Sequence, residues 1–117
     1  MPTKSNQPLF QRGDIFLVKF HPGYGSELQK YRPAIVVSDR ISFIDSRFAL
    51  IAPLTTNTKI MYSDSEFIIK NPALEKDSLL LCWYLWTIDA SRLVRKLGVL
   101  HSTEQKKMTH IIRDLFI

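Results

Sequence analysis

Apolar residues along this chain come in short runs, and polar, glycine- or proline-containing segments separate them. This pattern is typical of a sheet of short strands. The runs predicted as strands cover residues 15–20, 34–37, 48–54, 66–69, 79–86 and 96–100. The run 79–86 is the most apolar, and its eight residues have the length of a strand rather than a helix. Residues 89–93 are predicted to form one helical turn.

The C-terminal segment has the period of a helix instead. Its apolar positions recur at i, i+3, i+4 and i+7, and they are Met108, Ile111, Ile112 and Leu115. Such a stripe predicts one amphipathic helix that packs on the core. Ser102 followed by Gln105 predicts a capping box at its start.

About six strands and one terminal helix therefore fill the chain. The connections are too short for helical crossovers, so the sheet is expected to be mostly antiparallel. A small, strongly curved barrel with one helix packed on it fits this order. A chain of 117 residues has the size of one domain. We expect a single domain over residues 10–117 and a flexible leader over residues 1–9.

Composition argues against several classes of protein. The chain has one cysteine, Cys82, so it forms no intramolecular disulfide and no zinc site with several cysteine ligands. No apolar run approaches the roughly 20 residues that span a bilayer. The polar N-terminus does not resemble a secretory signal. We therefore expect a cytoplasmic protein with no membrane partner.

Sixteen Lys and Arg residues against eleven Asp and Glu residues give a net charge of +5, which permits a nucleic acid or an acidic protein as partner. The histidines do not stand at metal-ligand spacing, and the chain has no phosphate-binding glycine loop and no serine nucleophile motif. We therefore predict no metal site and no cofactor.

The remaining Arg, Thr, Glu and His residues suit the transfer of an RNA phosphodiester to its own 2′-hydroxyl. The substrate supplies the nucleophile, and the enzyme supplies a base, an acid and a cation that offsets the growing charge. Arginine suits the last role because its planar fork matches two phosphate oxygens. Arg32, before Pro33 at a strand start, is a candidate, although such an arginine is also common in surface ion pairs.

Three blocks of the sequence resemble one known family. They are Arg12-Gly13-Asp14-Ile15 with Gly25-Ser26-Glu27 and the run RPAIVVS from Arg32; Ala52-Pro53-Leu54-Thr55; and Thr87-Ile88-Asp89 with Arg92-Leu93 and Lys96-Leu97-Gly98. In this order and spacing they resemble the MazF/PemK toxins of type II toxin–antitoxin systems. The resemblance extends from about residue 12 to residue 117.

This resemblance implies a fold, an activity and partners. The fold is an SH3-like barrel of the MazF/PemK/CcdB type with a C-terminal helix, working as a homodimer. The implied activity is metal-independent, sequence-selective cleavage of single-stranded RNA, including mRNA, to 2′,3′-cyclic phosphate and 5′-hydroxyl ends. The implied inhibitor is a cognate antitoxin with a flexible acidic tail.

The resemblance also implies site residues. Arg32 and Thr55 match the family's catalytic pair, Glu27 matches a loop acid that is a candidate base, and His21 is a further candidate acid or base. The RNA-binding candidates are Tyr24, Lys30, Tyr31, Lys59, Tyr84 and Trp86. The residues alone leave alternatives open: Thr55 as a turn cap, Glu27 as a solvated charge and His21 as a structural loop residue.

One departure from the family pattern concerns the strand before Thr87. Many members carry a Gln-x-Arg pair where this chain has Tyr84 and Trp86, and a carboxylate where it has Leu81 and Trp83. The aromatic rings either stack on RNA bases, worth about 1–3 kcal/mol each, or pack in the core or a dimer interface. A catalytically weak member stays an alternative. So does a CcdB-like poison of DNA gyrase, although residues 113–117 lack its Trp-Gly-Ile-like ending.

Overall fold

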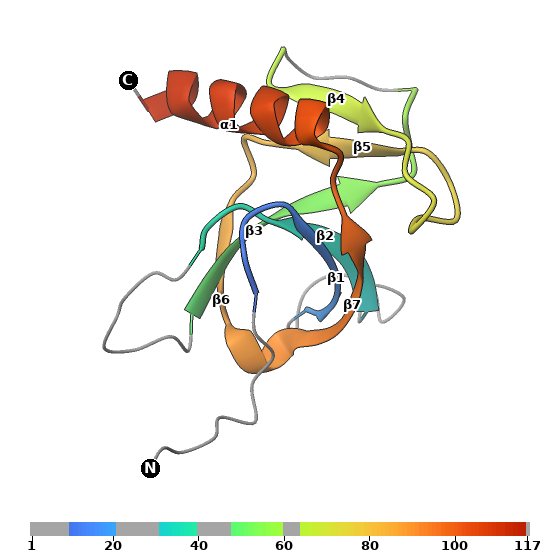
Figure 1. Cartoon of the computed structure of the whole chain (residues 1–117), viewed down its shortest axis with the longest axis vertical. Coiled ribbons are helices and arrows are strands. Elements are labelled where there is room, and N and C mark those ends of the chain that lie inside the picture. The colour runs from blue at the N-terminus through green and yellow to red at the C-terminus, as the bar shows by residue number, and fades with distance from the viewer. Residues whose placement is uncertain (1–9, 21–30, 40–47, 60–63, 117) are drawn as a thin grey trace.

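The computed structural model describes residues 10–20, 31–39, 48–59 and 64–116, so the expected leader lies outside it. Within these residues, seven strands form one sheet in the order β4-β5-β3-β2-β1-β7, and β6 pairs with β3 (Figure 1). The elements are β1 (Asp14–Lys19), β2 (Tyr31–Val36), β3 (Phe48–Thr55), β4 (Glu66–Ile69), β5 (Ser78–Leu81), β6 (Trp86–Asp89), a 3-10 helix (Ala90–Arg92), β7 (Leu93–Val99) and α1 (Ser102–Phe116).

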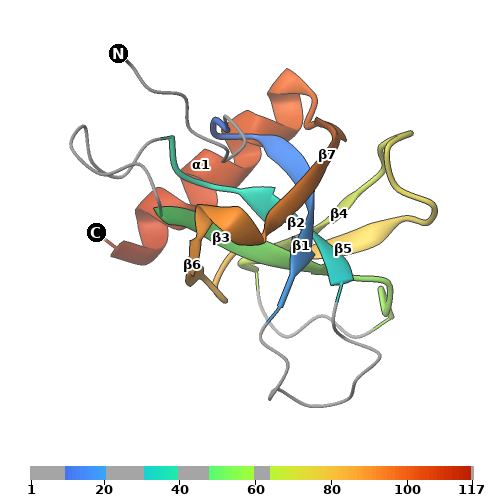
Figure 2. The same cartoon turned by 90° about the horizontal axis from the view of Figure 1, so that it is seen from below.

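The predicted antiparallel barrel with a C-terminal helix is confirmed. Every pairing in the sheet is antiparallel. The sheet curls into a barrel-like shape without closing, because its order ends at β4 on one side and β7 on the other. Seen from below, β2, β1 and β7 lie side by side (Figure 2).

Alternation along the strands divides the core in two. On β1, Phe16 and Val18 are buried inside the curl of the sheet, whereas Ile15 is buried on the other face, under α1. On β2, Val36 points into the curl and Ile35 points toward the helix side. Burying each such side chain contributes about 1.5–3 kcal/mol, so both faces of these strands hold the fold together.

The prediction of a single strand over residues 79–86 is wrong. β5 ends at Leu81, and β6 begins at Trp86. Both strands pair with the same edge of β3, and the chain turns away between them, with the Tyr84 N–H donating to the Leu81 carbonyl. The run is continuously apolar because its first half packs under α1 and its end packs inside the curl. Hydropathy alone does not distinguish one buried strand from a chain that passes between two cores.

The helix is confirmed, but its cap lies one residue earlier than predicted. The His101 carbonyl accepts the first helical hydrogen bond, from the Gln105 N–H at 2.9 Å. Glu104 Oε1 in turn accepts from the His101 N–H at 3.1 Å. His101 is therefore the N-cap residue, and Ser102 is the first residue of the helix.

The apolar stripe of α1 packs as predicted over most of its length. Met108 is fully buried, Ile111 and Ile112 are half-buried against the same cluster, and Leu115 near the helix end is 43% exposed.

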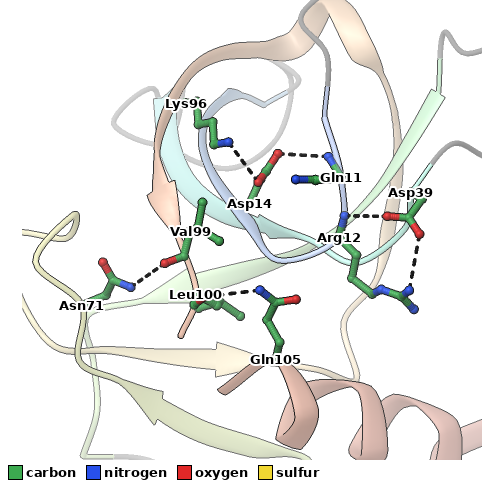
Figure 3. Close-up of polar contacts among 9 residues, drawn as sticks. All are labelled: Gln11, Arg12, Asp14, Asp39, Asn71, Lys96, Val99, Leu100 and Gln105. Atoms are coloured by element: carbon green, nitrogen blue, oxygen red, sulfur yellow. Dashed lines mark hydrogen bonds and ion pairs between the residues drawn. The ribbon is translucent and has the colours of Figure 1, made fainter. Parts of the chain in front are cut away.

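The Arg12-Gly13-Asp14 segment is a structural turn that joins four elements. Gly13 has φ +94°, its N–H donates to the Val36 carbonyl at 2.8 Å, and its carbonyl accepts from the Leu100 N–H at 2.9 Å. The Asp14 side chain is buried, and it accepts from the Gln11 N–H at 3.0 Å and pairs with Lys96 Nζ at 3.3 Å (Figure 3). The turn thereby connects β1 to β2, to β7 and to the start of α1.

Replacing Gly13 tests this turn. In Gly13→Ala, the left-handed backbone costs about 1–2 kcal/mol, and the new Cβ meets the Gln105 side chain at 2.5 Å. We expect a lower urea midpoint for unfolding at unchanged slope. Gly13→Ala should lower the free energy of unfolding less in a Gln105→Ala background than in the wild type. The difference between the two losses is the part that is due to the clash. Equal stability of wild type and Gly13→Ala would contradict the account.

Cys82 provides a test of the core under α1. Burial raises the pKa of its thiol from 9.0 to about 12, and the Glu66 charge adds to the rise. Between these values the folded chain keeps the thiol proton and the unfolded chain releases it, so stability falls as pH rises. The slope is up to about 1.4 kcal/mol per pH unit. Urea titrations should show this loss in the wild type and not in Cys82→Ala; identical pH profiles would refute the assignment.

Candidate active site at the ends of β2 and β3

Arg32 lies near the start of β2, on the face that lines the inside of the curl. It pairs with Val18 of β1, and it shares its face with Ala34 and Val36, which belong to the inner core. The side chain is half-buried, and its Nη2 lies 3.4 Å from the carbonyl oxygen of Leu54 on β3, to which it donates. The strand register therefore places the Arg32 guanidinium, partly shielded from solvent, at the open end of the barrel.

Thr55, the last residue of β3, follows Leu54, whose carbonyl accepts the hydrogen bond from Arg32. β2 and β3 pair Ala34 with Pro53, and continuing this register by two residues sets Arg32 opposite Thr55. Thr55 Oγ1 accepts a hydrogen bond from the Asn57 N–H at 3.2 Å, so the expected turn-capping role is present. A threonine hydroxyl has one donor and two acceptor sites, and this bond leaves the donor available.

Two further cationic residues flank this end of the barrel. Lys19 pairs with Tyr31, directly beside Arg32, and Arg92 Nη1 donates to the Lys19 carbonyl at 3.1 Å. Both residues line a pocket of about 440 Å³. Sequence reasoning assigned no role to Arg92, although the Arg92-Leu93 pair was part of the third block. Lys19 and Arg92 therefore add positive charge near Arg32, and Asp89 in the same pocket offsets part of it.

The aromatic residues after β5 divide into two environments. Trp86 is half-buried, and its ring meets Phe20 edge-on with centroids 5.3 Å apart. Tyr84 and Trp83 are 41% and 43% exposed, and their rings stack at 5.3 Å with an angle of 11° between the planes. Trp83 Nε1 donates to Glu66 on β4. Trp86 thus packs against the core, whereas Trp83 and Tyr84 are more exposed, and the Tyr84 ring also contacts Trp86 with centroids 5.5 Å apart.

The remaining predicted residues are only partly placed. Tyr31 is 50% exposed next to Arg32, and Lys59 is exposed in the turn after β3. His21, Tyr24, Glu27 and Lys30 lie outside the described residues. The described part of the chain contains no group of three acidic, histidine or cysteine residues suited to a metal ion. None of its helices is long and apolar enough to cross a membrane.

The profile of a known toxin family matches almost the whole chain. PemK-like, MazF-like toxins of type II toxin–antitoxin systems match residues 11–116. The chain therefore belongs to this family, as the three sequence blocks indicated. It is also 27% identical over 106 residues to a protein named Endoribonuclease MazF from Staphylococcus saprophyticus, covering 89% of this chain and 88% of that protein.

Solved structures of low sequence identity share the fold. MazF from Deinococcus radiodurans (Form-I) superposes with a TM-score of 0.73 at 19% identity, covering 93% of this chain and 97% of that one. A MazE–MazF structure (Form-II) from the same organism gives 0.71 at 15% identity, covering 93% and 96%. A mycobacterial endoribonuclease in complex with its cognate antitoxin gives 0.70 at 17%, covering 93% and 94%.

Proposed function

We propose that this toxin is an endoribonuclease that cleaves single-stranded RNA, including mRNA, at short preferred sequences. The observation that carries the proposal is the convergence of Arg32 and Thr55: the guanidinium is held by the Leu54 carbonyl, opposite the threonine, at a half-buried end of the barrel. Membership of the toxin family and the name of the Staphylococcus saprophyticus relative support the same activity.

The proposed reaction uses the RNA's own 2′-hydroxyl. Its oxygen attacks the adjacent phosphorus while a base takes the proton, and the bond from phosphorus to the 5′-oxygen breaks as an acid protonates that oxygen. The products are a 2′,3′-cyclic phosphate and a 5′-hydroxyl. Because the nucleophile comes from the substrate, no metal-bound water is needed, and we propose a metal-independent reaction.

Arg32 is proposed to stabilise the charge that develops on the phosphate. Its guanidinium stays protonated and presents two parallel N–H groups to two oxygens. Partial burial strengthens this attraction relative to bulk water. The free donor of the Thr55 hydroxyl is proposed to bind the same phosphate. Glu27 is the proposed base, and His21 the further candidate for proton transfer.

The proposed partners follow the family. The similar mycobacterial endoribonuclease is in complex with its cognate antitoxin, and one of the similar Deinococcus radiodurans structures is of MazE with MazF. A net charge of +5 suits an antitoxin with a flexible acidic tail. We also propose that the toxin is a homodimer, and we propose a cytoplasmic location.

Replacing Arg32 tests the proposed cation. We expect Arg32→Ala to cut single-stranded RNA in EDTA at least about 100-fold more slowly than the wild type, the usual loss when one donor to a developing oxyanion is removed. Arg32→Lys keeps the charge but not the fork, so it should recover only part of the rate. Arg113→Ala, on the exposed face of α1, is the matched control. Mapped ends should carry 5′-hydroxyls.

The outcome of the Arg32 experiment separates the classes of toxin. Wild-type cleavage with an unimpaired Arg32→Ala would remove Arg32 from the mechanism. Intact RNA from a folded wild-type sample would contradict the proposed activity and favour an inactive member or a poison that acts by binding, which a gyrase supercoiling assay would test next.

A second series tests the Thr55 hydroxyl. Thr55→Ser keeps the oxygen that binds both Asn57 and the proposed phosphate, so its rate should stay near that of the wild type. Thr55→Val is isosteric but has no hydroxyl, and we expect it to lose roughly 10-fold or more in rate, as for one charge-assisted hydrogen bond. Melting curves of both variants measure the separate cost of the lost turn cap. A Thr55→Val enzyme as fast as the wild type would exclude the hydroxyl from catalysis.

A further inference from the structure

A second pocket, of about 550 Å³, lies beside the candidate active site on the opposite face of the same strands. Pro33, Leu17 and Arg95 are cross-strand neighbours on β2, β1 and β7, and all three line it. Directly opposed residues point to the same face of a sheet. The pocket therefore has an apolar wall of Leu17 and Pro33, completed by Leu97, with a guanidinium at its edge.

The segment between β4 and β5 supplies the polar side of this pocket. Lys76 lines it together with Glu75 and the buried Ser78. Both Lys76 and Arg95 are exposed, and within the described residues neither side chain makes an ion pair or hydrogen bond. The two cations outnumber the one carboxylate, Glu75, so the pocket combines a net positive charge with an apolar wall. This combination suits a ligand with an anionic group and an apolar ring. A nucleotide has both.

The pocket begins one residue away from the catalytic pair on each of two strands. Pro33 follows Arg32 on β2, and Thr56, which also lines the pocket, follows Thr55 at the end of β3. A phosphate held at Arg32 and Thr55 would thus have the pocket next to it, around the end of the sheet. The next nucleotide of a bound strand is the ligand that this placement favours.

We propose that this pocket is a nucleotide subsite of the same RNA site. It binds a nucleotide that neighbours the scissile phosphate, with the base against Leu17, Pro33 and Leu97 and a non-scissile phosphate at Arg95 and Lys76. The inference rests on the proposed ribonuclease function and adds a determinant of sequence preference to it. An acidic peptide with apolar side chains would also contact the two cations and the apolar wall, but the position of the pocket next to Arg32 and Thr55 favours a nucleotide.

The position of the pocket also constrains the path of the RNA. Adjacent residues of a strand face opposite sides, so Arg32 points into the curl and Pro33 points away from it. RNA that occupies both places must bend sharply between the scissile phosphate and the neighbouring nucleotide. Such a bend separates the two bases, which requires an unpaired strand and is consistent with a single-stranded substrate.

The test compares two double variants that remove equal charge. Lys76→Gln/Arg95→Gln alters the pocket, and Lys106→Gln/Arg113→Gln alters exposed cations on α1. The probe is a short single-stranded RNA with 2′-deoxyribose at the mapped cleavage position, and anisotropy measures its dissociation constant at several salt concentrations. We expect roughly 10-fold weaker binding for the pocket variant and a log–log salt slope lower by about 0.7, because the proposal places one phosphate at the two cations.

Cleavage assays on the same variants complete the test. The pocket variant should show a raised KM with kcat nearly unchanged. The rise in KM should be similar for every base beside the cut, because the removed cations contact a phosphate and not a base. Equal RNA binding by both double variants, with active wild type, would overturn the subsite and leave the ribonuclease function standing. Unchanged RNA binding with weakened binding of the antitoxin would likewise overturn it and assign the pocket to the protein partner. A wild type that does not cut RNA would instead refute the proposed function.

Discussion

The buried carboxylate of Asp14 fixes the turn on which the rest of the barrel depends. It is nearly inaccessible to solvent, and it combines a backbone hydrogen bond from Gln11 with the ion pair to Lys96 on β7. A buried carboxylate without such partners would cost several kcal/mol. The adjacent Gly13 connects the turn to Val36 and Leu100. One short segment thus sets the positions of β1, β2, β7 and the start of α1.

This turn also determines where Arg32 points. β1 and β2 pair without interruption from Ile15–Ile35 to Lys19–Tyr31, so the register set at the turn is carried to the far end of the hairpin. A slip of one residue would exchange the two faces of β2. Arg32 would then leave the inside of the curl. The position of the proposed catalytic cation is therefore fixed by a turn at the opposite end of the strands.

Features of this structure that depend on interactions between residues close together in the chain could be predicted from the sequence, whereas those that depend on distant residues could not. Alternating runs and the i, i+3, i+4, i+7 stripe located the strands and α1, because local periodicity records which face is buried. The break at residues 82–85 and the His101 cap depended on pairing and hydrogen bonding that hydropathy does not encode. The family blocks brought forward Arg32 and Thr55, whose juxtaposition is a product of register. The pocket at Arg95 joins segments far apart in the chain, and no linear pattern marks it.

The opposite orientations of Arg32 and Pro33 have an evolutionary consequence. Residues that face the curl are constrained by the inner core and by the guanidinium, whereas Leu17, Pro33 and Arg95 face outward and belong to neither core. Mutations of the outward set can accumulate without disturbing the inward set, because the pleat separates them by the thickness of the sheet. Under the proposed function, a barrel built in this way can diversify the RNA that it recognises while Arg32 and Thr55 stay constant.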